Sequence, residues 1–177
     1  MGTALAQLNA RPDADVGVER LFRAHRLAMV RLAVFLVDDR ESAEDVVQDA
    51  FAGLHRKWHT LTSDDAAVAY LRTSVVNTAR SVLRRRRTVR RFPQPAADWL
   101  TEPAADGRML LAEEHREVIV ALRALPTRQR EVIVLRYWSE LSEAEIAKTL
   151  GISIGSVKSA ASRGRDAIAA KLEGTKR

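Results

Sequence analysis

The residues with the clearest chemical potential in this sequence are short hydroxyls and long cations between positions 156 and 165. On a helix that turns by ~100° per residue, several of these side chains share one polar face. Serine hydroxyls can approach phosphates or base edges, and arginine or lysine can donate to guanine acceptors. The alternative is a solvated amphipathic helix that binds no ligand. The polar face consists of Ser156, Ser159, Ser162, Arg163 and Asp166, with Lys158 and Arg165 on its flanks.

The residues before this face are typical of a helix-turn-helix unit. Ser142 and Glu145 form a capping box, in which the hydroxyl and the carboxylate satisfy backbone amides at a helix start. Gly151 ends that helix, and Ser153 caps the second helix, which carries the polar face. Two helices joined by so short a turn can place the second helix in the major groove of DNA. The turn therefore favours DNA binding over the solvated-helix interpretation.

A second basic stripe is expected on an earlier helix. Asn77, Arg80 and Arg84 are spaced i, i+3 and i+7, so they share one helix face. The stripe leads into residues 84–91, which hold six arginines in eight positions. Arginine at such positions suits phosphates, and asparagine can read a base edge. A solvated basic tail is the alternative, but the ordered start of the run favours nucleic-acid binding.

An acidic face precedes this stripe. Acidic residues gather on the first two turns of a predicted helix, where the helix dipole favours them. The dipole accounts for Glu41 and Glu44, but Asp45, Gln48 and Asp49 extend further along the exposed face. Because DNA would repel carboxylates, this face suggests a basic protein partner.

Other site chemistries find little support in the sequence. His55 and His59 have a spacing that can ligate a metal, but no cysteine exists and no nearby carboxylate completes the set. No glycine-rich phosphate loop and no nucleophile motif is present. We therefore predict no metal, no cofactor and no enzymatic activity.

The charge distribution divides the chain. Net charge is +6 overall, with 16 basic against 11 acidic residues in 1–91, none against three in 92–107, and 13 against nine in 108–177. The acidic strip holds three of the five prolines and lacks a helical period, so it reads as a flexible linker. A basic chain suits a polyanionic partner. No secretory signal is visible, and no apolar run approaches the ~20 residues that cross a bilayer, so we expect a cytoplasmic protein without membrane insertion.

Apolar residues recur at helical spacing almost everywhere outside the linker. The predicted fold class is all-α, with two small helical domains. We expect an N-terminal arm at 1–17, a first domain at 18–91, the linker at 92–107 and a helix-turn-helix domain at 108–177. The helical stripes run over Val18–Leu36, Ala43–Trp58, Val68–Leu83, Met109–Leu125 and Thr127–Trp138.

Three segments together resemble a known family. They are AEDVVQDAFAGLHRKW, AYLRTSVVNTARSVLRRRR and, beyond the linker, LPTRQREVIVLRYWSELSEAEIAKTLGISIGSVKSAASRGR. In this order and spacing they resemble the extracytoplasmic-function sigma factors, the small two-domain members of the bacterial sigma-70 family. The resemblance covers about residues 18–172. It implies a sigma-2-like first domain and a sigma-4-like second domain.

The resemblance also implies roles in the first domain. Asp45, Gln48 and Asp49 would bind the clamp helices of the largest polymerase subunit. Asn77, Arg80 and Arg84 would engage the −10 element. The loop Thr60–Asp65 would capture a base flipped from the non-template strand, which costs a few kcal/mol of stacking. Tyr70 stands where many relatives have tryptophan, so an aromatic ring would still stack at the melted junction.

In the second domain, Lys158, Ser159, Ser162 and Arg163 match the positions that read the −35 element. Ala160 departs from the arginine that is frequent there. The helix Thr127–Trp138 would help to seat this domain on the polymerase flap. Relatives are commonly held inactive by an anti-sigma factor, which makes such a protein a possible further partner.

The expected function is therefore promoter recognition and −10 melting as a subunit of bacterial RNA polymerase. Two alternatives remain open at this point. One is a helix-turn-helix regulator that acts without delivering polymerase. The other is a protein-binding decoy for polymerase or an anti-sigma factor, which would not need the stripe Asn77–Arg91.

Overall fold

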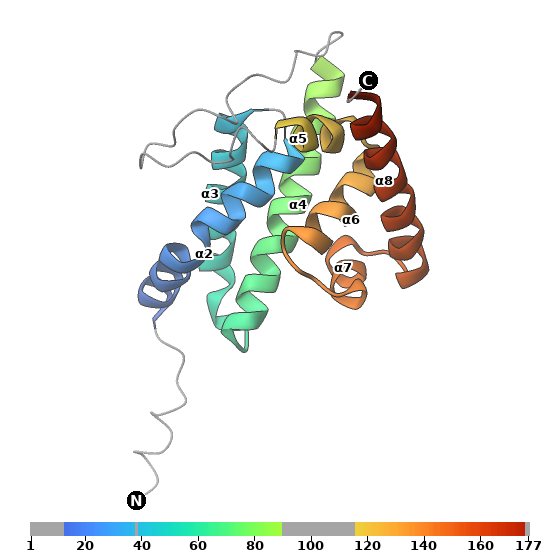
Figure 1. Cartoon of the computed structure of the whole chain (residues 1–177). Coiled ribbons are helices and arrows are strands. Elements are labelled where there is room, and N and C mark those ends of the chain that lie inside the picture. Colours follow the sequence, from blue (N-terminus) through green and yellow to red (C-terminus); the bar gives the residue numbers. More distant parts are fainter. Residues whose placement is uncertain (1–12, 38, 90–115, 176–177) are drawn as a thin grey trace, which may run out of the picture.

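The computed structural model describes residues 13–37, 39–89 and 116–175. This part of the chain is helical and contains no strand, which confirms the predicted all-α class. The helices form two lobes (Figure 1). The acidic linker 92–107 and most of the N-terminal arm lie outside the described residues. Within the described ranges, no helix is both long enough and apolar enough to span a bilayer.

The N-terminal lobe is built from three long helices whose apolar faces meet. Leu32, Leu54 and Leu71 come from different helices and are fully buried, as is Trp58. Asp39 caps the second helix by accepting a hydrogen bond from the Ser42 amide. The elements are α2 (Ala14–Leu36), α3 (Arg40–Lys57), the short 3-10 helix Trp58–Thr60 and α4 (Asp64–Val89).

The C-terminal lobe contains the expected helix-turn-helix. The capping box of Ser142 and Glu145 is present, and Gly151 ends the first helix with a left-handed φ of 65°. Ser153 then accepts a hydrogen bond from the Ser156 amide at 3.1 Å, which caps the second helix. The elements are α5 (Arg116–Ala124), α6 (Thr127–Tyr137), α7 (Glu143–Leu150) and α8 (Ile154–Thr175).

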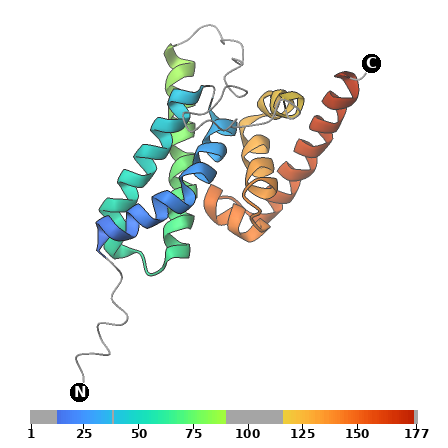
Figure 2. The same ribbon diagram turned by 60° about the vertical axis from the view of Figure 1, so that its left-hand side comes forward.

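The two lobes pack directly against each other. Figures 1 and 2 show the C-terminal lobe along one side of α2 and α4, with α3 on the other side of the molecule. Buried side chains of both lobes join in one continuous apolar core. At the contact, the rings of Phe35 in α2 and Trp138 after α6 meet edge to face, with centroids 4.5 Å apart. The sequence predicted two domains, but it did not predict this packing.

Candidate nucleic-acid interface

The polar face of α8 is presented to solvent. Ser156, Lys158, Ser159, Ser162 and Arg163 are all exposed, whereas Val157 and Ala161 on the opposite side are buried. The 3.6-residue period of the sequence therefore places the face correctly. Ala160 is only 2% exposed, so it belongs to the packing side of the helix.

A shallow polar groove of about 510 Å³ runs beside this face. Ser156, Ser159 and Arg163 line it from α8, and Arg128 joins them from α6. Arg128 was not among the predicted site residues, although its place in the basic first turn TRQR of α6 was a signal. The groove thus brings together two hydroxyls and one guanidinium of α8 with one guanidinium of α6. A polyanion could bind there.

Glu143 positions the edge of this surface. The Arg136 guanidinium donates to its carboxylate at 2.9 Å, and the Lys158 ammonium lies 3.8 Å away. The hydrogen bond from Arg136 is the main reason that the pKa of Glu143 falls below its ordinary value. Lys158 is therefore held loosely at the α7 side of the polar face, while its side chain stays 66% exposed.

The predicted stripe on α4, Asn77, Arg80 and Arg84, is only partly exposed to solvent. Asn77 and Arg84 are exposed, but Arg80 turns towards the C-terminal lobe. Its Nε and NH2 groups donate to the two carboxylate oxygens of Glu131 in α6, at 2.5 and 2.7 Å. Arg80 also donates to the Asn77 side chain at 3.3 Å. Hydrogen bonding to Glu131 raises the pKa of the Arg80 guanidinium, against the opposing effect of burial.

One member of the arginine run supports the fold. Arg86 pairs with Asp39 and donates to the Ser42 hydroxyl at 2.5 Å, so it holds the start of α3. Burial alone would raise the pKa of Asp39, but the bonds from Arg86 and the Ser42 amide lower it below its ordinary value. Residues 90 and 91 of the run lie outside the described residues.

Tyr70 lies at a polar pocket of about 420 Å³ between α3 and α4. Asp49 and Asn77 also line this pocket, and the Lys57 ammonium lies 5.5 Å from the tyrosine ring centre. The ring hydroxyl occupies the space above Gly53, where an added Cβ would lie 2.8 Å from it. Gly53, which the sequence analysis did not single out, therefore sets the position of Tyr70.

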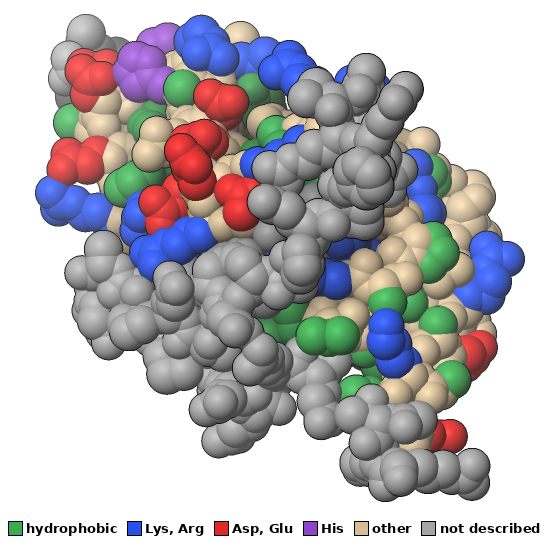
Figure 3. Space-filling model, turned by 90° about the horizontal axis from the view of Figure 1, so that it is seen from above, with side chains coloured by type: hydrophobic (Ala, Val, Ile, Leu, Met, Phe, Trp, Pro, Cys, Tyr) green, Lys and Arg blue, Asp and Glu red, His purple; other side chains and the backbone are tan. Residues whose placement is uncertain are grey.

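The acidic face of α3 is accessible. Asp45, Gln48 and Asp49 are exposed on one side of the helix, away from the contact between the lobes. Figure 3 shows a group of acidic side chains gathered on the surface seen from above. The acidic face borders the pocket between α3 and α4, because Asp49 lines that pocket together with Tyr70 and Asn77.

Comparison with known proteins identifies the family. The Sigma-70 region 2 family matches residues 21–89, and the Sigma-70 region 4 family matches residues 115–168. An RNA polymerase sigma-E factor of Streptomyces coelicolor is 34% identical over 145 residues, which span 80% of this chain and 77% of the relative. The ECF RNA polymerase sigma factor SigM of Mycobacterium tuberculosis is 34% identical over 154 residues, 87% of this chain and 76% of the relative. The chain belongs to the ECF sigma factors.

A solved structure extends this likeness to the arrangement of the lobes. It is the sigma factor RpoE of Bartonella quintana in complex with the anti-sigma factor NepR. The TM-score is 0.71 at 28% identity, over 88% of this chain and 98% of the other. Because so large a share of the chain superposes, the likeness includes both lobes.

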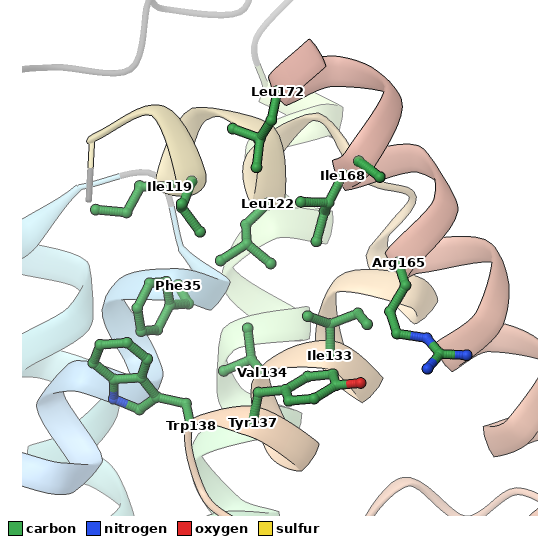
Figure 4. Close-up of a pocket in the computed structure, with 12 residues that line it drawn as sticks. Phe35, Ile119, Leu122, Ile133, Val134, Tyr137, Trp138, Arg165, Ile168 and Leu172 are labelled. Atoms are coloured by element: carbon green, nitrogen blue, oxygen red, sulfur yellow. The ribbon is translucent and has the colours of Figure 1, made fainter. Parts of the chain in front are cut away.

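This sigma factor also carries an apolar pocket of about 420 Å³ that the sequence analysis missed (Figure 4). Ile133 and Tyr137 of α6 face Ile168 of α8 across it, and Phe35 reaches it from the N-terminal lobe. Tyr137 and Trp138 remain 54% and 41% exposed at its rim. The pocket could not be found from periodicity, because it forms only where α2, α5, α6 and α8 meet.

Proposed function

We propose that this sigma factor directs core RNA polymerase to specific promoters and helps to melt their −10 region. The observation that carries the proposal is the exposed hydroxyl and cation face of α8 on a capped helix-turn-helix, within the segment that matches region 4. Such a face can reach base edges and phosphates in a major groove.

Reading of the −35 element is assigned to α8. Ser159, Ser162 and Arg163 would contact base edges, with Ser156 and Lys158 at the edge of the same surface. A guanidinium can pair with both acceptors of a guanine, which a serine cannot do, so Arg163 would carry most of the discrimination. Arg128, across the polar groove, would add a phosphate contact.

Melting of the −10 element is assigned to α4 and its pocket. Tyr70 would stack on an unpaired base, as aromatic side chains do in single-strand binding. Asn77, Arg80 and Arg84 would hold the backbone and base edges beside it. The loop Thr60–Asp65 would receive the flipped base.

Polymerase binding is assigned to the acidic face. Asp45, Gln48 and Asp49 would meet the clamp helices of the largest subunit, and α6 would help to seat the C-terminal lobe on the flap. An anti-sigma factor is a further proposed partner, because the solved RpoE is bound to one. This role requires no catalytic group, cofactor or metal from the chain, and it places the protein in the cytoplasm, with polymerase and DNA.

The acidic face provides the test. The double substitution Asp45→Lys and Asp49→Lys should weaken assembly with core polymerase, since like charges would then face the clamp. A matched control, Asp166→Lys with Glu173→Lys, reverses two exposed charges on α8 instead. Core binding is measured with fluorescently labelled protein. Normal assembly by the α3 variant would reduce its acidic face to a solvated helix start and favour a regulator that works without polymerase.

A further inference from the structure

An ion pair between a partly buried arginine and a buried glutamate joins the two lobes of this sigma factor. Arg80 of α4 and Glu131 of α6 are 51 positions apart, and both oxygens of the carboxylate accept from the guanidinium. The Glu131 side chain is 3% exposed and the Arg80 side chain 28%. The bidentate geometry is the strongest that an arginine and a carboxylate can adopt.

Apolar side chains of both lobes also meet across this interface, where α2 packs against α5 and α6, and α4 packs against α7. The Phe35 and Trp138 rings touch, but Trp138 stays 41% exposed. The Arg123 guanidinium reaches the carbonyls of Val34 and Val37 at the end of α2, at 3.4 Å. Arg80 and Glu131 add a bidentate charged contact between α4 and α6.

We propose that the Arg80–Glu131 pair is an autoinhibitory latch that keeps the lobes closed and withholds Arg80 from DNA. The proposal rests on the DNA-binding role given to Arg80 above. In the closed form Glu131 occupies the guanidinium donors that a phosphate would need. A DNA strand on α4 would also bring its charge towards the Glu131 carboxylate.

The latch is suited to reversible opening. The pair gains little net stability, because desolvation of the buried Glu131 carboxylate and the partly buried Arg80 guanidinium offsets much of their attraction. On opening, Arg80 moves from a carboxylate to a phosphate, which accepts the same paired hydrogen bonds. Glu131 keeps a partner, since Arg128 lies one helical turn away on α6 and donates to it at 3.2 Å.

The closed form leaves the acidic face uncovered. Asp45 and Asp49 stay exposed on α3, which makes no substantial contact with the C-terminal lobe. Polymerase can therefore dock on the N-terminal lobe before the latch opens. Arg80 would then be released only after the protein binds core polymerase. The free protein would therefore bind single-stranded DNA poorly.

Opening can be measured directly because the chain has no cysteine. Cysteines introduced for spin labels at Ala52 of α3 and Ala170 of α8, both exposed, report the separation of the lobes. Glu131→Gln and Arg80→Ala should each broaden the distance distribution towards longer values. Glu143→Gln, which breaks a pair within the C-terminal lobe, should leave it unchanged. If both latch variants keep the native distribution, the pair does not hold the closure. Thermal unfolding by circular dichroism confirms that each variant is folded.

The consequence for DNA is tested on the full chain without polymerase, with a labelled single-stranded oligonucleotide of randomised sequence. If the closed form is about nine-tenths populated, opening should tighten binding by up to about tenfold. Glu131→Gln should show this gain, whereas Arg80→Ala should open without gaining affinity.

The double variant identifies the released group. In Glu131→Gln with Arg80→Ala the gain should disappear, because Arg80 is the released group. A gain that persists would point to Arg128 and overturn the proposal, as would a Glu131→Gln variant that opens without any gain. These measurements contain no polymerase. They therefore test the latch even if the proposed binding of core polymerase proves wrong.

Discussion

Close contact between α8 and α6 makes opposite predictions for two glycines of the same helix. An added Cβ at Gly164 would lie 2.8 Å from the Cγ1 atom of Ile133, a side chain of α6 that is 5% exposed. An added Cβ at Gly155 would meet only the Ser153 hydroxyl, at 3.8 Å. Both glycines have ordinary helical backbones, so alanine can adopt the conformation at either position.

The magnitudes follow from two competing effects. Alanine is favoured over glycine inside a helix by about 0.5–1 kcal/mol. Overpacking a well-filled contact costs about 1–3 kcal/mol. Gly155→Ala should show only the stabilisation from the better helix former. This stabilisation is reduced because the position lies in the first turn of α8. Gly164→Ala carries both effects, so a net destabilisation of roughly 1 kcal/mol is expected. The difference between the two variants, about 1–3 kcal/mol, isolates the contact with Ile133.

Urea and thermal unfolding of the full chain measure this difference. For a chain of this size each kcal/mol moves Tm by about 2–4 °C. We expect Gly155→Ala to unfold at or above the wild-type Tm and Gly164→Ala below it. If Gly164→Ala is as stable as Gly155→Ala, α8 does not pack on α6 as closely as the structure shows. The placement of the recognition helix would then need revision.

Three further outcomes are expected. Gly53→Ala should displace the Tyr70 hydroxyl and weaken promoter opening in a permanganate assay. Adding Tyr70→Phe, which removes that hydroxyl, should restore promoter opening. Lack of rescue would show that the alanine methyl and the tyrosine hydroxyl do not compete for space. Because the folded-state pKa of Asp39 is lowered, its stabilising effect is present above the ordinary carboxyl pKa of about 4 and is lost as pH falls through the lower folded value. The urea midpoint of Asp39→Asn should therefore depend less on pH below 5, and equal slopes would contradict this. In a promoter library with holoenzyme, Arg163→Ala should cost ~1–3 kcal/mol and relax one −35 position. Lys158→Ala should instead weaken all promoters alike and reduce the salt slope by about one; unchanged −35 preferences in Arg163→Ala would make the helix a phosphate clamp.

The fold could be predicted where local chemistry determines it. The capping box at Ser142 and the left-handed Gly151 bound α7 in sequence and structure alike, because cap interactions involve neighbouring residues. Between the predicted stripes Val18–Leu36 and Ala43–Trp58, Asp39 likewise caps the start of α3 through the amide of the nearby Ser42. The exposed polar face of α8 followed from the helical period alone. Its base contacts and the polymerase role of Asp45 stay predictions.

Partners across the fold could not be predicted. In the sequence, Glu131 is an ordinary acidic residue near a helix start. No neighbouring residue indicates that it binds Arg80, which lies 51 positions earlier. Arg86 was grouped with a DNA-binding run, yet it pairs with Asp39 because α3 and α4 pack side by side. Periodicity assigns a residue to a face, but which charge lies opposite depends on how the helices pack.

Transcription with purified core polymerase tests the central claim most directly. Genomic DNA from the source organism is transcribed with core alone, with core and this chain, and with core and the Asp45→Lys, Asp49→Lys variant, and transcript 5′ ends are mapped. We predict initiation at a defined promoter set only when core and the native chain are both present. The chain alone should bind duplex DNA weakly at those promoters. Tight, specific duplex binding by the chain alone, with no new initiation when core is added, would contradict the central claim.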